Sequence, residues 1–107
     1  MSKHSAPDTN EPSYASGEVV YTLEMVEHIT RLPRRTILVY HRHGLISPAQ
    51  QAAGVNSWRF DDETLRVLRR AEWLRRELGV NLAGIKLIMG LLDEVEALRA
   101  ELRQRRP

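Results

Sequence analysis

The stretch RRTILVYHRHGL, residues 34–45, contains the side chains of this sequence that are best suited to bind an anion. Arginines and histidines surround an aliphatic middle, and the stretch contains no aspartate or glutamate. The wider segment 31–43 holds four arginines and no acid, although the chain has 14 acidic residues. Guanidinium groups bind phosphate oxygens and the O6 and N7 atoms of guanine, so arginines clustered on one element are typical of nucleic-acid binders. The alternatives are a protein-binding surface or plain solvation of the charges.

Other kinds of chemistry find little support in the sequence. His41 and His43 are two residues apart, so a helix would point them to different faces, and the chain has no cysteine that could complete a metal-ligand set. The sequence has no glycine-rich phosphate loop and no nucleophile–base pair at a recognisable spacing. We therefore predict no enzyme activity, no catalytic residue, no metal and no cofactor.

A first short helix is predicted over residues 22–30. Leu23, Val26 and Ile29 recur at helical spacing. Thr22 is a suitable N-cap because its hydroxyl oxygen can accept a hydrogen bond from a free backbone N–H of the first turn.

The basic segment itself should form a second helix. Proline is tolerated at a first helical position, so this helix can begin at Pro33 and continue to His43. Gly44 should end it, since a left-handed C-cap is easiest for glycine. Two short helices joined by a tight break, the second of them basic, are typical of a helix-turn-helix.

Residues 45–60 are predicted to form an irregular or hairpin-like wing. They contain Pro48, Gly54 and Asn56, and they end in the aromatic segment 58–60, which should be a strand. A third helix should then begin at a cap formed by one of two aspartates and end before a glycine, which predicts the range 61–78. Its inner stripe is expected to consist of Leu65, Leu68, Ala71, Leu74 (or the aliphatic stem of Arg75) and Leu78.

The last helix, from a cap at Asn81 to Pro107, shows the clearest periodicity in the sequence. Apolar residues step by three and four over two heptads, and charged residues flank them. This seam consists of Ile88, Leu91, Val95, Leu98 and Leu102. An isolated helix with an exposed leucine seam is marginal in water, so we expect a homodimer contact through it. Packing of the seam on the chain's own core is the alternative.

The length of 107 residues allows one small domain but not two independent cores. We predict a disordered tail over residues 1–18, a winged helix-turn-helix domain over 19–80 and a dimerisation helix over 81–107. The chain has no apolar run of membrane-spanning length and no apolar segment typical of a signal peptide, so we expect no membrane association and a cytoplasmic location.

This order of parts resembles the MerR-type winged-helix family over about residues 19–103. The first helix of the family is similar to YTLEMVEHIT, and its recognition helix, usually RTLRYYERRGLLSP, is similar to RRTILVYHRHGLISP. The wing and acidic helix cap of the family are matched by WRFDDETLRVLRR. The segment LGVNLAGIKLIMGLLDEVEALRAEL is close to two chaperone-linked branches, the HspR-like heat-shock repressors, which bind DNA, and the CbpM-like modulators, which bind and inhibit a J-domain co-chaperone.

Four positions depart from the family pattern. Arg31 stands at the turn glycine, Pro33 at the usual Ser or Thr cap, and Leu38 at a helix position that is often arginine. Trp58 stands where DNA-binding members commonly have arginine, and it resembles the CbpM-like branch, in which it would anchor a protein partner.

The resemblance implies a mainly α fold, a MerR-like winged helix-turn-helix followed by a C-terminal dimerisation helix. It also implies a dimeric DNA-binding transcriptional regulator linked to chaperone or heat-shock genes, with a CbpM-type modulator as the alternative. First-turn residues of the recognition helix would reach base edges, and later residues and the wing would contact phosphates. The predicted DNA-binding residues are Arg34, Arg35, Thr36, Tyr40, Arg42, His43 and Arg59.

Overall fold

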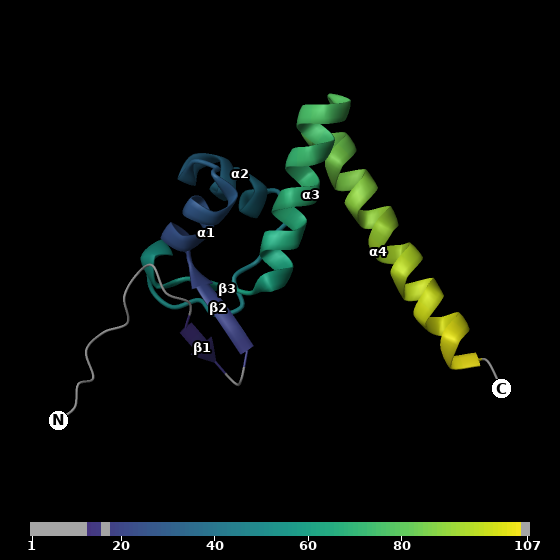
Figure 1. Ribbon diagram of the computed structural model, residues 1–107, viewed down its shortest axis with the longest axis horizontal. Helices are drawn as coiled ribbons and strands as arrows, with labels where there is room; N and C mark the ends of the chain where they lie inside the picture. Colours follow the sequence, from purple (N-terminus) through teal and green to yellow (C-terminus); the bar gives the residue numbers. More distant parts are fainter. Residues whose placement is uncertain (1–12, 16–17, 106–107) are drawn as a thin grey trace. The chain divides into compact units, whose positions relative to one another are not determined.

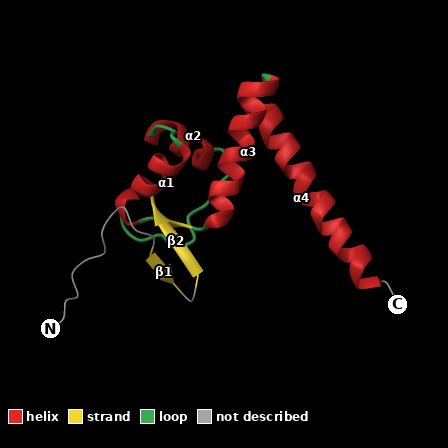
Figure 2. Ribbon diagram, in the orientation of Figure 1, coloured by secondary structure: helices red, strands yellow, loops and turns green. Residues whose placement is uncertain are grey.

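The computed structural model describes residues 13–15 and 18–105, and most of them lie in four α-helices (Figure 1). The elements follow one another in the order β1 (Ser13–Ala15), β2 (Glu18–Thr22), α1 (Leu23–Thr30), α2 (Arg34–Arg42), the 3-10 helix η1 (Val55–Ser57), β3 (Arg59–Phe60), α3 (Asp62–Leu78) and α4 (Leu82–Arg105). The predicted fold class, mainly α with a winged helix-turn-helix, is confirmed, and the structure adds a small sheet (Figure 2).

The chain divides into two compact units, Met1–Arg69 and Arg70–Pro107. The division falls inside α3, whereas the sequence placed the boundary between residues 80 and 81. The difference arises because α3 is one continuous helix, and its sequence pattern does not change where the division falls.

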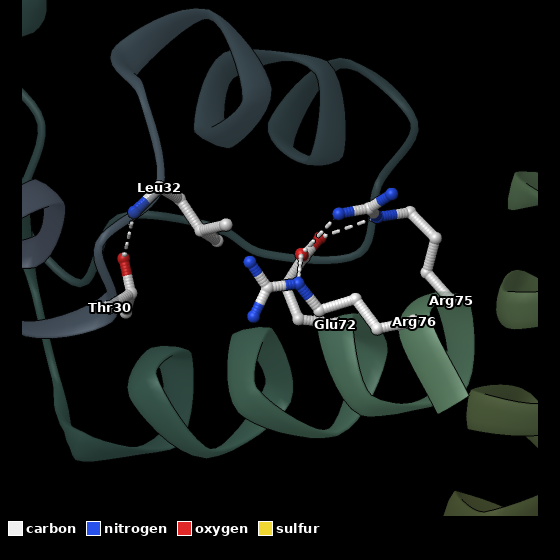
Figure 3. A network of polar contacts seen from close by, with 5 residues as sticks. All are labelled: Thr30, Leu32, Glu72, Arg75 and Arg76. Carbon is white, nitrogen blue, oxygen red and sulfur yellow. Dashed lines mark hydrogen bonds and ion pairs between the residues drawn. The ribbon is translucent and has the colours of Figure 1, made fainter. Parts of the chain in front are cut away.

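Helix α1 is fixed by a side-chain cap at its start and by a backbone hydrogen bond at its end. The Thr22 hydroxyl oxygen accepts from the N–H of Met25 at 3.1 Å, which confirms Thr22 as the N-cap. At the other end Arg31 adopts a left-handed conformation, φ 61° and ψ 29°, and its N–H donates to Glu27 O at 2.8 Å. The Thr30 hydroxyl accepts from the N–H of Leu32 at 3.3 Å in the same turn (Figure 3). The two helices of the motif are therefore joined by a tight, hydrogen-bonded turn.

Helix α2 begins one residue later than predicted, because Pro33 is its N-cap rather than its first helical residue. Pro33 makes no side-chain capping bond, but its carbonyl accepts from the N–H groups of Thr36 and Ile37 at 3.0 and 3.2 Å. Gly44 follows the helix with φ +80°, as predicted for the residue that ends it.

A three-stranded antiparallel sheet in the order β1-β2-β3 lies beside these helices. Ser13 pairs with Val20, and Tyr21 pairs with Phe60, so β2 connects the N-terminal strand to the wing strand. The prediction of a disordered tail through residue 18 is wrong for 13–15 and 18. β1 is held by backbone pairing with β2, and its sequence has no apolar alternation that would have indicated a strand. Residues 1–12 and 16–17 of the predicted tail lie outside the described residues.

The core of the first unit is aliphatic apart from three buried aromatic residues, one from α2 and two from the wing. Full burial of each large apolar side chain stabilises the fold by roughly 1.5–3 kcal/mol. The buried apolar residues are Val20, Leu23, Met25, Val26, Leu32, Ile37, Tyr40, Ile46, Trp58, Phe60, Leu65 and Leu68.

The wing is hairpin-like, as predicted. Gln50 and Arg59 form an antiparallel bridge, in which Arg59 N–H donates to Gln50 O at 2.9 Å and Gln50 N–H donates to Arg59 O at 3.1 Å. Gly54, with φ +81°, precedes the short helix η1, whose end leads into β3. Asp61 then caps α3, because its carboxylate accepts from the N–H of Thr64 at 3.2 Å.

The second unit contains the C-terminal part of α3 and the whole of α4. Gly79, with φ +67°, ends α3, and the Asn81 side chain caps α4 by accepting from the N–H of Gly84 at 2.8 Å. The buried apolar residues here are Ala71, Leu74, Ile85 and Met89. Leu78 was predicted to be in the inner stripe but is 60% exposed. It is the last residue of α3, beyond which Gly79 turns the chain.

Glu72 is a buried carboxylate in this unit. Its two oxygens accept from Arg75 at 2.8 and 3.1 Å, and Arg76 Nε lies 3.8 Å from one of them (Figure 3). A buried carboxylate is tolerated when it is paired with a cation, and here the two arginines come from the next turn of the same helix. Among the described residues, no helix has both the length and the apolar character needed to cross a membrane.

Candidate nucleic-acid interface

The outward face of α2 is set by the burial of its inner face. Ile37 and Tyr40 are buried, whereas Arg35 and Arg42 are exposed. Because an α-helix turns about 100° per residue, two residues that are seven apart lie on nearly the same side, about 10 Å apart along the axis. Arg35 and Arg42 therefore form one stripe, opposite the buried pair. A rigid helix presents both guanidinium groups in the same direction.

The middle of this outward face is apolar. Leu38 and Val39 flank the line between the two arginines and are both half-buried. Arg35, Leu38, Val39 and Arg42 together are called the α2 outward face below. Such a surface can contact the methyl group of thymine between two polar contacts, or it can pack against another protein.

Arg34 and Thr36 lie beside this face. The Nε atom of Arg34 is 3.3 Å from Glu27 Oε2, so Arg34 forms an exposed ion pair with α1. Exposed ion pairs contribute only about 0–1 kcal/mol, so the guanidinium can exchange this carboxylate for a phosphate at little cost. Thr36 is half-buried.

Tyr40 is a core residue. Its side chain is 4% exposed, which contradicts its prediction as a phosphate contact. The same 100° geometry that places Arg35 and Arg42 outside places Tyr40 inside with Ile37. The sequence alone left both positions open because tyrosine suits either environment.

Arg42 and His43 lie at the C-terminal end of α2, and both are exposed. The Arg42 guanidinium also interacts favourably with the partial negative charge of the helix end, which would keep it in place without any ligand. Their exposure leaves them available for a phosphate contact.

The wing residue Arg59 is half-buried and bound to the wing itself. Its Nη1 atom donates to Trp58 O at 2.9 Å and to Asn56 O at 3.4 Å. These bonds orient the guanidinium along the wing backbone, and its other donors remain for a ligand.

Trp58 is buried, with 8% of its surface exposed, so it does not offer the protein-binding anchor that the sequence suggested. Its ring lies 4.4 Å from the His41 ring, centre to centre, at 51°, and 6.2 Å from Phe60 in an edge-to-face arrangement. Trp58 thus joins the wing to α2. It is a packing residue between two elements of the motif.

Arg31 was not among the predicted contacts, yet it is exposed and sits three residues before the first turn of α2. It belongs to the same acid-free segment as the predicted arginines, so the absence of acidic residues around it could have identified Arg31 as a candidate contact. The left-handed turn directs the chain from α1 into α2, so Arg31 adds a cation at the start of the basic helix.

The seam of α4 is exposed. Four of its five residues exceed a third of their maximum exposure, and Ile88 is half-buried. The exposed values are 52% for Leu91, 39% for Val95, 57% for Leu98 and 64% for Leu102. Among the described residues of α4, none after Met89 is buried, so the buried core of the second unit ends near Met89.

Comparison with known proteins agrees with this architecture. The family model described as MerR HTH family regulatory protein matches residues 21–106. The heat shock protein HspR of Streptomyces coelicolor is 33% identical over 81 residues, which are 76% of this chain and 52% of that protein. The chaperone modulatory protein CbpM of Coxiella burnetii (strain Dugway 5J108-111) is 31% identical over 81 residues, 76% of this chain and 74% of its own length.

A third relative is the chaperone modulatory protein CbpM of Pseudomonas putida (strain GB-1), which is 39% identical over 66 residues, 59% of this chain and 63% of that protein. The chain thus spans about half the length of the HspR relative and more of the CbpM relatives. The relatives' names describe heat-shock and modulatory proteins rather than enzymes. With the helix-turn-helix, the wing and the match over most of its length, the chain belongs to the MerR helix-turn-helix family of regulatory proteins.

Proposed function

We propose that the chain is a dimeric transcriptional regulator that binds duplex DNA through the α2 outward face. The observation that supports this most is the placement of Arg35 and Arg42, both exposed on one side of a helix whose other side is core. No carboxylate occurs in the segment 31–43 that could neutralise them from within.

The two arginines have different roles in this proposal. Arg35 is in the first turn of α2, from which a recognition helix contacts base edges, and its fork matches O6 and N7 of guanine. Arg42 lies two turns further on and contacts a phosphate. Arg34, Thr36, His43 and Arg59 position the motif on the backbone without specifying sequence.

Dimerisation through the α4 seam completes the proposal. An isolated α4 helix would leave the leucines of the seam in water, whereas the α4 helix of a second copy would bury them. Burial of each leucine contributes roughly 1.5–3 kcal/mol. A dimer presents two α2 helices, so it binds two half-sites about one turn of DNA, roughly 34–36 Å, apart or a multiple of that. A regulator of this kind acts in the cytoplasm.

The link to chaperones rests on the relatives, which are named as a heat shock protein and as chaperone modulatory proteins. We propose that the genes controlled by the chain are chaperone or heat-shock genes. No small-molecule cofactor is part of the proposal.

A second candidate function is that of a CbpM-type modulator that binds a J-domain co-chaperone and inhibits it. The half-exposed Leu38 and Val39 in the middle of the α2 outward face favour it, because a DNA-binding helix usually has polar groups there. The buried position of Trp58 removes the anchor first considered for such a partner.

The salt dependence of binding tests the DNA proposal. If a dimer neutralises about six to ten phosphates, its affinity for a duplex from its own promoter should fall about 10³–10⁵-fold between roughly 50 and 200 mM salt. Fluorescence anisotropy with a labelled duplex measures this. Arg103→Ala, which changes an exposed residue of α4, is the matched control and should leave the salt dependence of the affinity unchanged. Absence of binding to any promoter duplex at low salt would refute the proposal and leave the modulator.

A further inference from the structure

Trp73 on α3 is an exposed aromatic residue that neither DNA binding nor the α4 seam uses. Its side chain is 55% exposed. The other aromatic residues whose side chains the structure describes are buried or half-buried, namely Tyr21, Tyr40, Trp58 and Phe60. Tryptophan is strongly enriched at the centres of protein interfaces, since it combines a large apolar area with one N–H donor.

The position of Trp73 on the helix follows from the burial of its neighbours. Ala71 and Leu74 are buried, and a helix turns about 100° per residue, so Trp73 lies on the side away from them. Two of its neighbours on the helix surface are the residues three before and three after it, Arg70 and Arg76. All three side chains are exposed.

Arg70, Trp73 and Arg76 are called the α3 outer surface. Arg76 is 69% exposed, and its 3.8 Å contact with Glu72 is loose, so the guanidinium keeps most of its donors free for a ligand. An indole between two guanidinium groups fits an apolar side chain with carboxylates on either side, because arginine binds carboxylates through two parallel hydrogen bonds.

We infer that the α3 outer surface is a docking site for an acidic segment of another protein. A second copy of this chain is a poor occupant, because two such surfaces would bring arginine against arginine. Duplex DNA is also disfavoured, since Glu77 lies one turn beyond Trp73 on the same side and would face a continuous phosphate backbone. A basic surface this short suits one or two carboxylates. The α3 outer surface shares no residue with the α2 outward face.

Nuclear magnetic resonance can test the inference because the chain has two tryptophans, one exposed and one buried. The probe is a short synthetic peptide that repeats the unit Glu-Glu-Leu, and the control is its Gln-Gln-Leu counterpart. The indole N–H signal of Trp73, assigned with Trp73→Phe, should shift on titration with the glutamate peptide only. The Trp58 signal should stay in place as the internal reference.

Variants then separate the site from the fold. Arg70→Gln should weaken the peptide about tenfold, which is the typical loss of one charge-assisted hydrogen-bonded contact. Arg103→Gln, a matched change on α4, should bind as the wild type does. Circular dichroism checks that each variant is folded, and promoter binding should be the same for Arg70→Gln and wild type.

Three outcomes would overturn the inference. The Trp73 signal could stay unmoved up to about 1 mM glutamate peptide. The glutamine peptide could shift it equally, which would indicate a merely apolar contact. Duplex DNA could shift it while the peptide does not, which would assign the surface to nucleic acid. None of these outcomes bears on the α2 outward face, because promoter binding is measured independently.

Discussion

Arg31 has a backbone conformation that normally belongs to glycine. It is the one residue other than glycine with positive φ in the described part of the chain. A side chain in the left-handed region costs roughly 1–2 kcal/mol, because Cβ approaches the following carbonyl oxygen. The conformation persists because the turn between α1 and α2 requires it, and the Arg31 N–H bond to Glu27 O holds it.

Replacement of Arg31 therefore tests how much strain the turn stores. Arg31→Gly removes the Cβ strain but makes the unfolded chain more flexible, so the free energy of unfolding should stay equal or rise by up to about 1 kcal/mol. Arg31→Val should lower it by more than about 1 kcal/mol, because a branched side chain is least tolerated at this φ. Urea denaturation measures both. A clear loss of stability in Arg31→Gly would show that the guanidinium itself supports the turn.

At the scale of the elements, the wing and α2 form one structural piece through Trp58. Its tilted ring contact with His41 and its edge contact with Phe60 connect a loop of irregular structure to the basic helix. The orientation of the α2 outward face therefore depends on the buried Trp58 indole in the wing.

Truncation of this contact should act on stability first. Trp58→Ala should lower the free energy of unfolding by about 3–5 kcal/mol, the usual cost of removing a large buried aromatic side chain. Gln51→Ala, an exposed wing substitution, is the control and should change it by no more than about 0.5 kcal/mol. Thermal denaturation followed by circular dichroism measures both. A stable Trp58→Ala protein that has lost only a protein partner would restore Trp58 as a binding anchor.

The sequence predicted the helices well because their ends have local causes. Thr22, Gly44 and Gly79 act at the positions expected of them, since caps depend on residues that are close in the chain. β1 was missed because its stability comes from pairing with β2, which no local pattern announces. Leu78 fits the inner stripe of α3 by periodicity, but periodicity does not show at which residue the packing partner of the helix ends.

The candidate site was predictable in part for the same reason. The arginines of α2 were identified from charge, and the structure adds which of them share a face. Tyr40 and Trp58 were assigned to ligands although both are buried, because an amphipathic aromatic side chain suits core and surface alike. Only the burial of each residue separates the two cases.

At the scale of the whole molecule, α4 has two separate apolar faces. Ile85 and Met89 are buried, whereas Leu91, Leu98 and Leu102 lie on another side of the helix and are exposed. A helix of this length with an uncovered leucine seam is typical of a protein that associates with a second copy.

Disruption of the seam should separate the subunits. Sedimentation at micromolar concentration should show a dimer for the wild type and a monomer, or an unfolded chain, for Leu98→Asp, because a buried carboxylate has no partner in the seam. Ala97→Asp, the adjacent exposed position away from the seam, is the control and should remain dimeric. A folded wild-type monomer would contradict the dimer.

The binding of promoter DNA by two α2 variants tests the central claim most directly. Fluorescence anisotropy with the specific duplex and with single-base variants compares Arg35→Ala and Arg42→Ala. We expect Arg35→Ala to cost about 1–3 kcal/mol on the specific site and to relax preference at one base position, and Arg42→Ala to weaken all duplexes alike. If both variants bind the promoter as tightly and as selectively as the wild type, the α2 outward face does not bind DNA.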